Sequence, residues 1–122
     1  MKWLAMTMLI IMAAAGEAVA DWQVYREGKT VIAAVDYLSY APYHNQPSVW
    51  VRWHYVKPRQ GVAGRKIQFT ADCTAHRLFE IADATYNTAG DFIATSKYYQ
   101  APREFPIKPG SLNEATFELL CK

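Results

Sequence analysis

The chain has almost no net charge. Its 13 Lys and Arg residues stand against 11 Asp and Glu, so the formal balance at pH 7 is +2, and neither sign is concentrated in one stretch. Nucleic-acid-binding proteins gather basic residues on one face or along one helix. We therefore expect no nucleic-acid partner, and no long-range attraction toward an acidic partner.

The sequence also lacks the motifs of common catalytic sites. No nucleophile elbow, Cys–His pair or phosphate-binding glycine loop is present. Asp36, Asp72, Glu80 and Asp83 supply carboxylates. Acid–base catalysis requires two of them to converge in a cleft with separated pKa values, which a sequence does not reveal. We predict that the protein is not an enzyme.

Histidine is scarce, and its spacing does not suit a metal. His44, His54 and His76 fall on separate segments, and none lies at the i, i+4 spacing of a helical zinc motif. A metal or haem site built from them with tyrosine ligands is the less favoured alternative to surface or half-buried histidines. We predict neither a metal nor a cofactor.

A long hydrophobic run occurs only at the beginning of the chain. Lys2 precedes an apolar stretch over Trp3–Ala15, and Ala18–Ala20 fits the A-x-A cleavage pattern of a signal peptide. The stretch is shorter than the roughly 20 residues of a membrane span, and no cysteine follows it that could carry a lipid anchor. We expect a cleaved signal peptide over residues 1–20 and a single domain over 21–122, exported to the periplasm or secreted.

Only two cysteines are present, Cys73 and Cys121. An exported chain can oxidise them, and they allow one internal pairing. A bond across this separation stabilises a small domain by roughly 4 kcal/mol in the chain-entropy model. The alternative of two reactive thiols needs a thiolate-stabilising environment, which the neighbouring residues do not suggest. We predict a Cys73–Cys121 disulfide.

Most of the remaining chain is typical of antiparallel strands, because β-branched and aromatic segments alternate with turn signals. Prolines and Asn45 indicate a loop over Leu38–Ser48, and a second loop is expected over Lys57–Gly64. The strands are expected over Trp22–Tyr25, Thr30–Asp36, Val49–Val56, Lys66–Cys73, His76–Tyr86 and Phe92–Tyr98.

Alternation within these strands predicts which side chains are buried. Ile67, Phe69, Ala71 and Cys73 share one face of their strand and should point into the core. In the strand expected over His76–Tyr86, the apolar residues change from odd to even positions, which a β-bulge near Ile81 would absorb.

One helix is expected, at the end of the chain. Pro109 and Gly110 break the preceding segment, and Ser111 with Glu114 forms a capping box. The apolar stripe that follows is Leu112, Ala115, Thr116, Leu119 and Leu120. Such a short helix is marginal alone in water, so we expect Cys121 to hold it against the strand that carries Cys73. The predicted fold is α+β and mainly β, an antiparallel sheet of about six strands with a short disulfide-tied helix.

The order of several short segments resembles the surface-adhesin protein E family of Gram-negative envelopes. These segments are Trp22, Val35–Asp36, Val49–Val51, Asp72–Cys73, Tyr86–Gly90, Pro109–Ser111 and Cys121. The resemblance implies the same sheet with a disulfide-held helix. It also implies adhesion, meaning binding of a host extracellular-matrix or plasma protein. The family's named adhesin is lipid-anchored, and this chain lacks the cysteine for that anchor.

The candidate binding residues are aromatic. Tyr, Trp and Arg dominate binding hot spots because they combine rigid area with a polar group. The predicted binding residues are Tyr37, Tyr40, Tyr43, His44, Trp50 and Arg52. A second group comprises Tyr98, Tyr99, Arg103 and Phe105. The alternative for both groups is that these side chains pack loops against the sheet.

The sequence thus favours a non-enzymatic, adhesin-like module that binds a protein partner. Two alternatives fit the same features: an inhibitor of a hydrolase such as lysozyme, which would insert a polar loop into the enzyme's cleft, and a structural accessory of an envelope assembly. Open sheet edges also allow a homodimer by edge pairing.

Overall fold

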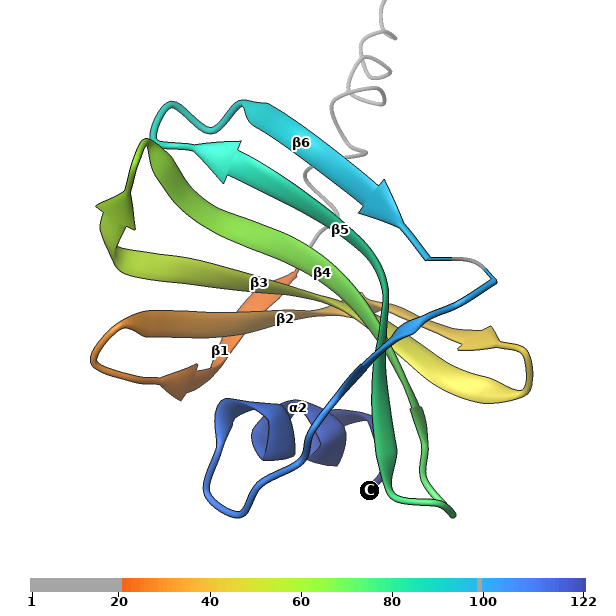
Figure 1. Cartoon of the computed structure of the whole chain (residues 1–122). Helices are drawn as coiled ribbons and strands as arrows, with labels where there is room; N and C mark the ends of the chain where they lie inside the picture. Colours follow the sequence, from red (N-terminus) through yellow and green to blue (C-terminus); the bar gives the residue numbers. More distant parts are fainter. Residues whose placement is uncertain (1–20, 99) are drawn as a thin grey trace, which may run out of the picture.

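The computed structural model describes residues 21–98 and 100–122 (Figure 1). They form one antiparallel sheet with a helix packed on one face. The sheet has the strand order β1-β2-β3-β4-β5-β6, and β7 pairs with β5. The elements are β1 (Trp22–Glu27), β2 (Val31–Tyr43), β3 (Gln46–Arg59), β4 (Val62–Asp72), β5 (Arg77–Asn87), β6 (Phe92–Lys97), β7 (Arg103–Phe105) and α2 (Leu112–Leu120). The predicted mainly β fold with a C-terminal helix is confirmed, and β7 is an additional short strand.

The loop predicted over Leu38–Ser48 is wrong. The segment is the end of a long hairpin, in which Pro42 pairs with Pro47 and the turn is His44–Asn45. Both turn residues have positive φ, 48° and 67°. Pairing of β3 with β4 starts only at Ser48, so the prolines lie where no second neighbour needs their missing N–H groups. The hairpin end therefore extends past the sheet (Figure 1).

The loop predicted over Lys57–Gly64 is also wrong. Strand β3 continues to Arg59 and β4 begins at Val62. The connection is Gln60–Gly61, with φ of 51° and 81°. Two consecutive positive φ values are the geometry of a tight hairpin turn, so the two strands need no longer connection.

Alternation along β4 is confirmed, and so is the bulge in β5. Ile67, Phe69 and Ala71 are fully buried. Gln68 pairs with Ala82 and Phe69 pairs with Glu80, which leaves Ile81 as the extra residue. The prediction that Cys73 points into the core is wrong, because β4 ends at Asp72 and Cys73 lies exposed beyond it.

The helix begins where the capping box predicts. Ser111 Oγ accepts the backbone N–H of Glu114 at 3.1 Å. The Glu114 carboxylate accepts the N–H of Gly110 at 2.8 Å, one residue before the position a standard capping box uses. The buried helix residues are Thr116, Phe117 and Leu120. Phe117 was absent from the predicted stripe.

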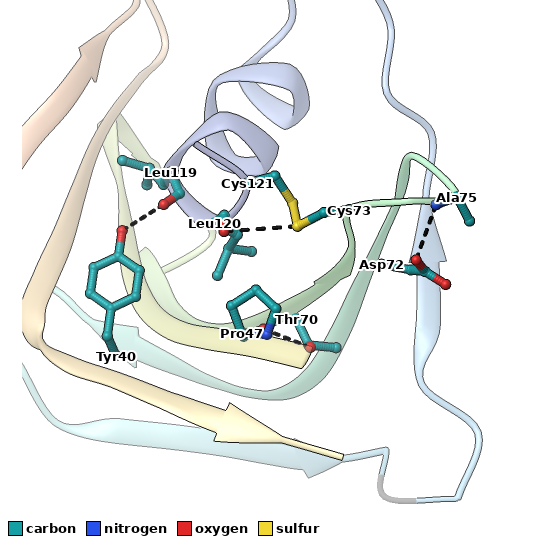
Figure 2. Close-up of a disulfide and its surroundings, with 9 residues drawn as sticks. All are labelled: Tyr40, Pro47, Thr70, Asp72, Cys73, Ala75, Leu119, Leu120 and Cys121. Atoms are coloured by element: carbon teal, nitrogen blue, oxygen red, sulfur yellow. Dashed lines mark hydrogen bonds between the residues drawn. A yellow bond between two sulfur atoms is a disulfide. The ribbon is translucent and has the colours of Figure 1, made fainter. Parts of the chain in front are cut away.

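Three kinds of link hold α2 on the sheet. Cys73 and Cys121 form the predicted disulfide, with a Cα–Cα distance of 5.5 Å (Figure 2). The guanidinium of Arg26 donates to the carbonyls of Gly110 and Ser111 at 2.7 and 2.9 Å. A hydroxyl pair between Tyr25 and α2 is the third link.

Tyr25 is placed by a bulge in β1. Val24 pairs with Ala34 and Arg26 with Ala33, so Tyr25 between them has no partner in the ladder. Its hydroxyl lies 2.8 Å from Thr116 Oγ1 on α2 and accepts the indole N–H of Trp53 at 3.0 Å. Burial raises the pKa of Tyr25 to about 12. The tyrosine therefore stays neutral and joins the helix to β3.

Candidate functional site

Three large apolar or aromatic side chains lie exposed between Asp36 and Ala41 of β2. Tyr37, Leu38 and Tyr40 have exposed fractions of 42%, 66% and 38%. The rings of Tyr37 and Tyr40 are stacked with centroids 6.1 Å apart. Tyr40 also donates its hydroxyl to the carbonyl of Leu119 at 2.9 Å (Figure 2). Tyr40 thus both contacts the helix and presents its ring to solvent.

The end of the hairpin carries the other predicted residues of this loop. The rings of Tyr43 and His44 meet edge to face at 4.4 Å. Beside them is a shallow hollow of about 480 Å³. Its lining residues are Tyr40, Ala41, Pro42, Asn45, Gln46 and Pro47. We call Tyr37–Gln46 the tyrosine hairpin.

Trp50 and Arg52 do not belong to this surface. Val49 and Val51, on either side of Trp50, are fully buried in the core beneath α2. Since successive side chains of a strand alternate between faces, Trp50 and Arg52 lie on the opposite face of the sheet, which we call the open face. The structure therefore separates the predicted binding residues into two groups.

The open face holds a second hollow, of about 490 Å³. Its lining includes at least one residue from each of β1 to β6. The lining residues are Val24, Ile32, Ala34, Arg52, His54, Lys66, Tyr86, Gly90 and Phe92. We call this hollow the basic trough, because among its described lining residues the two permanently charged side chains, Arg52 and Lys66, are cations.

Aromatic rings hold these two cations. The Arg52 guanidinium lies 4.8 Å from the centre of the Trp22 ring. The Lys66 ammonium lies 5.6 Å from the Trp22 ring and 5.2 Å from the Phe92 ring. Contacts of this kind contribute about 0.5–1 kcal/mol each at exposed sites. Strands β1 and β6, the two outer strands of the sheet order, thus both contact one lysine of β4.

A glycine leaves room for the Tyr86 ring, which lines the trough. The Tyr86 ring crosses Gly64, and a Cβ on Gly64 would lie 2.5 Å from the Tyr86 hydroxyl oxygen and from the Trp53 carbonyl oxygen. From there the hydroxyl of Tyr86 reaches Nδ1 of His54 at 3.2 Å. Burial raises the pKa of Tyr86, so the phenol remains neutral at physiological pH.

Two of the candidate carboxylates converge, on a shared arginine. Arg65 contacts Glu80 at 3.1 Å and Asp83 at 2.6 Å. Glu80 is fully buried, and burial raises its pKa although Arg65 opposes the shift. Both carboxylates are engaged by one guanidinium, which is typical of a structural ion pair. Over the described residues, no group of three His, Cys, Asp or Glu side chains is placed to hold a metal.

A family comparison adds to this geometry. Residues 22–122 match the model of the surface-adhesin protein E family. The chain belongs to the surface-adhesin protein E family. The comparison with curated proteins and that with solved structures each returned no match. In residues 21–98 and 100–122 of this adhesin-family chain, no helix is long and apolar enough to cross a membrane.

The second aromatic group of this adhesin-family chain is partly a packing element. Phe105 lies 5.5 Å from Phe69 and 6.4 Å from Trp53, ring centre to ring centre. Arg103 covers the Phe105 ring at 5.5 Å, and the backbone of Tyr98 donates to Ile81 at 2.8 Å. Tyr99 lies outside the described residues, as does the expected signal peptide.

Sequence reasoning missed several residues that the structure places at the trough. Trp22 and Lys66 lie in predicted strands, but neither was predicted to bind. The same holds for Phe92 and Tyr86. Period-two alternation already puts Lys66 on the face opposite Ile67. What it does not give is the strand order, which brings β1, β4 and β6 residues into contact.

Proposed function

We propose that this member of the surface-adhesin protein E family is an exported, non-enzymatic envelope protein that binds a protein partner through its tyrosine hairpin. The observation that carries the proposal is the exposed, stacked pair of Tyr37 and Tyr40, with the exposed Leu38 next in the chain, on a hairpin whose end extends past the sheet. Exposed aromatic clusters on rigid elements are typical binding anchors. The partner class that family membership favours is a host extracellular-matrix or plasma protein.

The contacts of the hairpin suit this role. Tyr40 is fixed by its hydrogen bond to Leu119, and the disulfide holds the helix that offers this carbonyl. A pre-ordered anchor loses less conformational entropy on binding than a mobile one does. Tyr43 and His44 extend the surface toward the turn. Trp50 and Arg52 lie on the open face, so the proposed binding surface does not include them.

Binding to immobilised extracellular-matrix and plasma glycoproteins tests the proposal. Tyr37→Ala and Leu38→Ala should each weaken a captured partner by about thirtyfold, the effect of a hot-spot residue worth 2 kcal/mol. Stability should change by less than about 0.5 kcal/mol for Leu38→Ala, because Leu38 is mostly exposed, and by about 0.5–1.5 kcal/mol for Tyr37→Ala, which loses the ring contact with Tyr40. Val56→Ala, at another apolar position that is 48% exposed, is the matched control and should leave affinity unchanged.

Location is tested separately on intact cells. Protease added outside should cleave a surface-displayed adhesin, and its mature form should begin at Asp21 or within a residue or two. A protein spared by protease until the outer membrane is opened would contradict adhesion. Unchanged affinity in both hairpin variants would remove the tyrosine hairpin as the site. The family match gives no support to the inhibitor or the structural accessory.

A further inference from the structure

The basic trough lies on the opposite face from the helix and plays no part in the proposed adhesion. One of its sides is apolar, formed by Val24, Ile32 and Ala34 of β1 and β2. Arg52 and Lys66 lie side by side on neighbouring strands, where they are paired in the β3–β4 ladder. The hollow thus combines an apolar wall with two adjacent positive charges.

Within the part of the chain that the structure describes, no carboxylate forms an ion pair with either charge. None of the nine lining residues is acidic. Across residues 21–98 and 100–122, neither Arg52 nor Lys66 has a carboxylate oxygen within 4 Å, the distance of an ion pair. Asp36 also lies on the open face, paired with Trp50 rather than with Arg52. One of its carboxylate oxygens accepts the backbone N–H groups of Asp21 and Leu38.

The rings fix the cations without removing their charge. A cation over an aromatic face keeps its charge, because the ring carries no formal charge, and it loses side-chain freedom. Lys66, between Trp22 and Phe92, and Arg52, against Trp22, are therefore ordered before any ligand arrives. An anion bound there gains charge-assisted hydrogen bonds at a reduced entropic cost.

The size of the trough limits the occupant. Ligand pockets for small molecules span about 300–1,000 Å³, and the trough measures about 490 Å³. Phe92 and Trp22 both contact Lys66, so rings from β1 and β6 flank this lysine on the open face. This space suits one compact molecule better than a length of polypeptide.

We propose that the basic trough binds a small amphiphilic anion, a compact aromatic or aliphatic body that carries one acidic group. The acidic group would contact Arg52 and Lys66, and the body would lie against Val24, Ile32 and the Tyr86 ring. The Tyr86 hydroxyl is already engaged by His54, so the ring presents its apolar surface to the ligand.

Two fluorescent probes of the same skeleton test this proposal. Anilinonaphthalene sulfonate carries one negative charge, and N-phenyl-1-naphthylamine is its neutral counterpart. The folded protein over residues 21–122 should bind the anionic probe about tenfold or more tightly than the neutral one, since two charge-assisted contacts contribute. Nuclear magnetic resonance shifts should be confined to the residues that line the trough. Raising the salt concentration should weaken the anionic probe only.

A matched pair of variants at Val24 makes the test independent of folding defects. Val24 is 58% exposed and lines the trough, so Val24→Glu and Val24→Gln add side chains of the same shape. The glutamate should weaken the anionic probe about fivefold to tenfold relative to the glutamine, because a like charge about 4 Å away in water-like surroundings costs about 1 kcal/mol. The two variants should bind the neutral probe with equal affinity.

Lysine variants identify the recognising charge. Lys66→Met should weaken the anionic probe about tenfold, whereas Lys108→Met, at an exposed lysine before α2, should have no effect. Equal affinities of the two probes for the unaltered protein would overturn the proposal. So would equal anion binding by the two Val24 variants, or shifts confined to the tyrosine hairpin. Sedimentation with anionic lipid vesicles without binding of the soluble probe would assign the charges to a membrane instead.

Discussion

The two faces of the sheet are built from the same strands but stabilised differently. On the helix face, Val35, Val49, Val51, Ile67 and Phe69 are fully buried beneath α2, β7 and the segment between them. On the open face, the layer above the strands consists of long cations lying against rings. The helix face is closed by covalent and apolar contacts, and the open face by contacts that leave charge accessible.

This difference between the two faces shows that stability and binding can depend on different residues in this fold. Apolar burial yields about 25 cal/mol per Å² of surface removed from water, so the helix face carries the folding energy. Aromatic–cation contacts at exposed positions are weaker, so the exposed cations and rings of the open face can vary with a smaller loss of stability than the buried core. Binding surfaces can therefore lie on the open face and on the tyrosine hairpin without weakening the core.

The largest expected effect is on the helix face. Phe69→Ala should lower the free energy of unfolding by about 3–5 kcal/mol, because it removes a fully buried ring that contacts Trp53 and Phe105. Trp22→Ala on the open face should cost about 1–2 kcal/mol, the sum of two cation contacts. Urea unfolding of both variants measures the contrast. Equal losses would show that the two faces contribute alike.

A smaller loss of stability is expected on removing the Tyr25 hydroxyl, which joins α2 to β3. Tyr25→Phe removes the acceptor of the Trp53 indole N–H and the partner of Thr116. An unsatisfied buried donor costs about 1–3 kcal/mol, so thermal unfolding should show a loss in that range. Tyr55→Phe is the control: no described hydrogen bond involves its hydroxyl, and its melting temperature should be unchanged. An unchanged melting temperature for Tyr25→Phe would mean that water replaces the tyrosine as acceptor of the Trp53 indole N–H.

The smallest effect concerns pH and compares a buried carboxylate with an exposed one. Burial raises the pKa of Glu80, so the folded protein binds a proton there more tightly than the unfolded chain does. Its contribution to stability therefore falls as pH rises from the unfolded pKa through the folded one. The stability of the unaltered protein relative to Glu80→Gln should decline over that interval.

Glu104 supplies the opposite sign. Its hydrogen bonds to Arg77 lower the pKa of Glu104, so its contribution is present above the unfolded pKa and is lost as pH falls through the folded one. The stability of the unaltered protein relative to Glu104→Gln should therefore rise with pH. The rise should be small, because the Arg77–Glu104 pair is exposed. Chemical unfolding of the three proteins between pH 3 and 7 measures both slopes. Parallel slopes for the two variants would contradict the burial argument at Glu80.

Much of the fold followed from local patterns. The Ser111 cap, the alternation along β4 and the slip at Ile81 were all visible as short-range signals, and each is present in the structure. The two hairpins were misjudged for a physical reason. Turn-forming residues such as Asn45 and Gly61 mark where a chain reverses, but not how far the strands stay paired on either side.

The candidate site was only partly accessible from sequence. The aromatic character of Tyr37 and Tyr40 was evident, and their exposure agrees with the predicted binding surface. Whether they bind stays a prediction. The six residues do not share one surface, because Tyr40 bonds to Leu119 of α2, whereas the alternation of β3 places Trp50 and Arg52 on the open face.

By itself, the sequence determined where six of the strands lie but not how long they are, together with the capped helix and the single disulfide, because period, capping and the presence of only two cysteines act over short distances or leave one choice. The tertiary structure decided which distant side chains meet. Trp22, Arg52 and Lys66 come from three strands, and Arg65, Glu80 and Asp83 from two. Such meetings depend on strand order, register and bulges, which are fixed by the packing of the whole sheet rather than by any one segment.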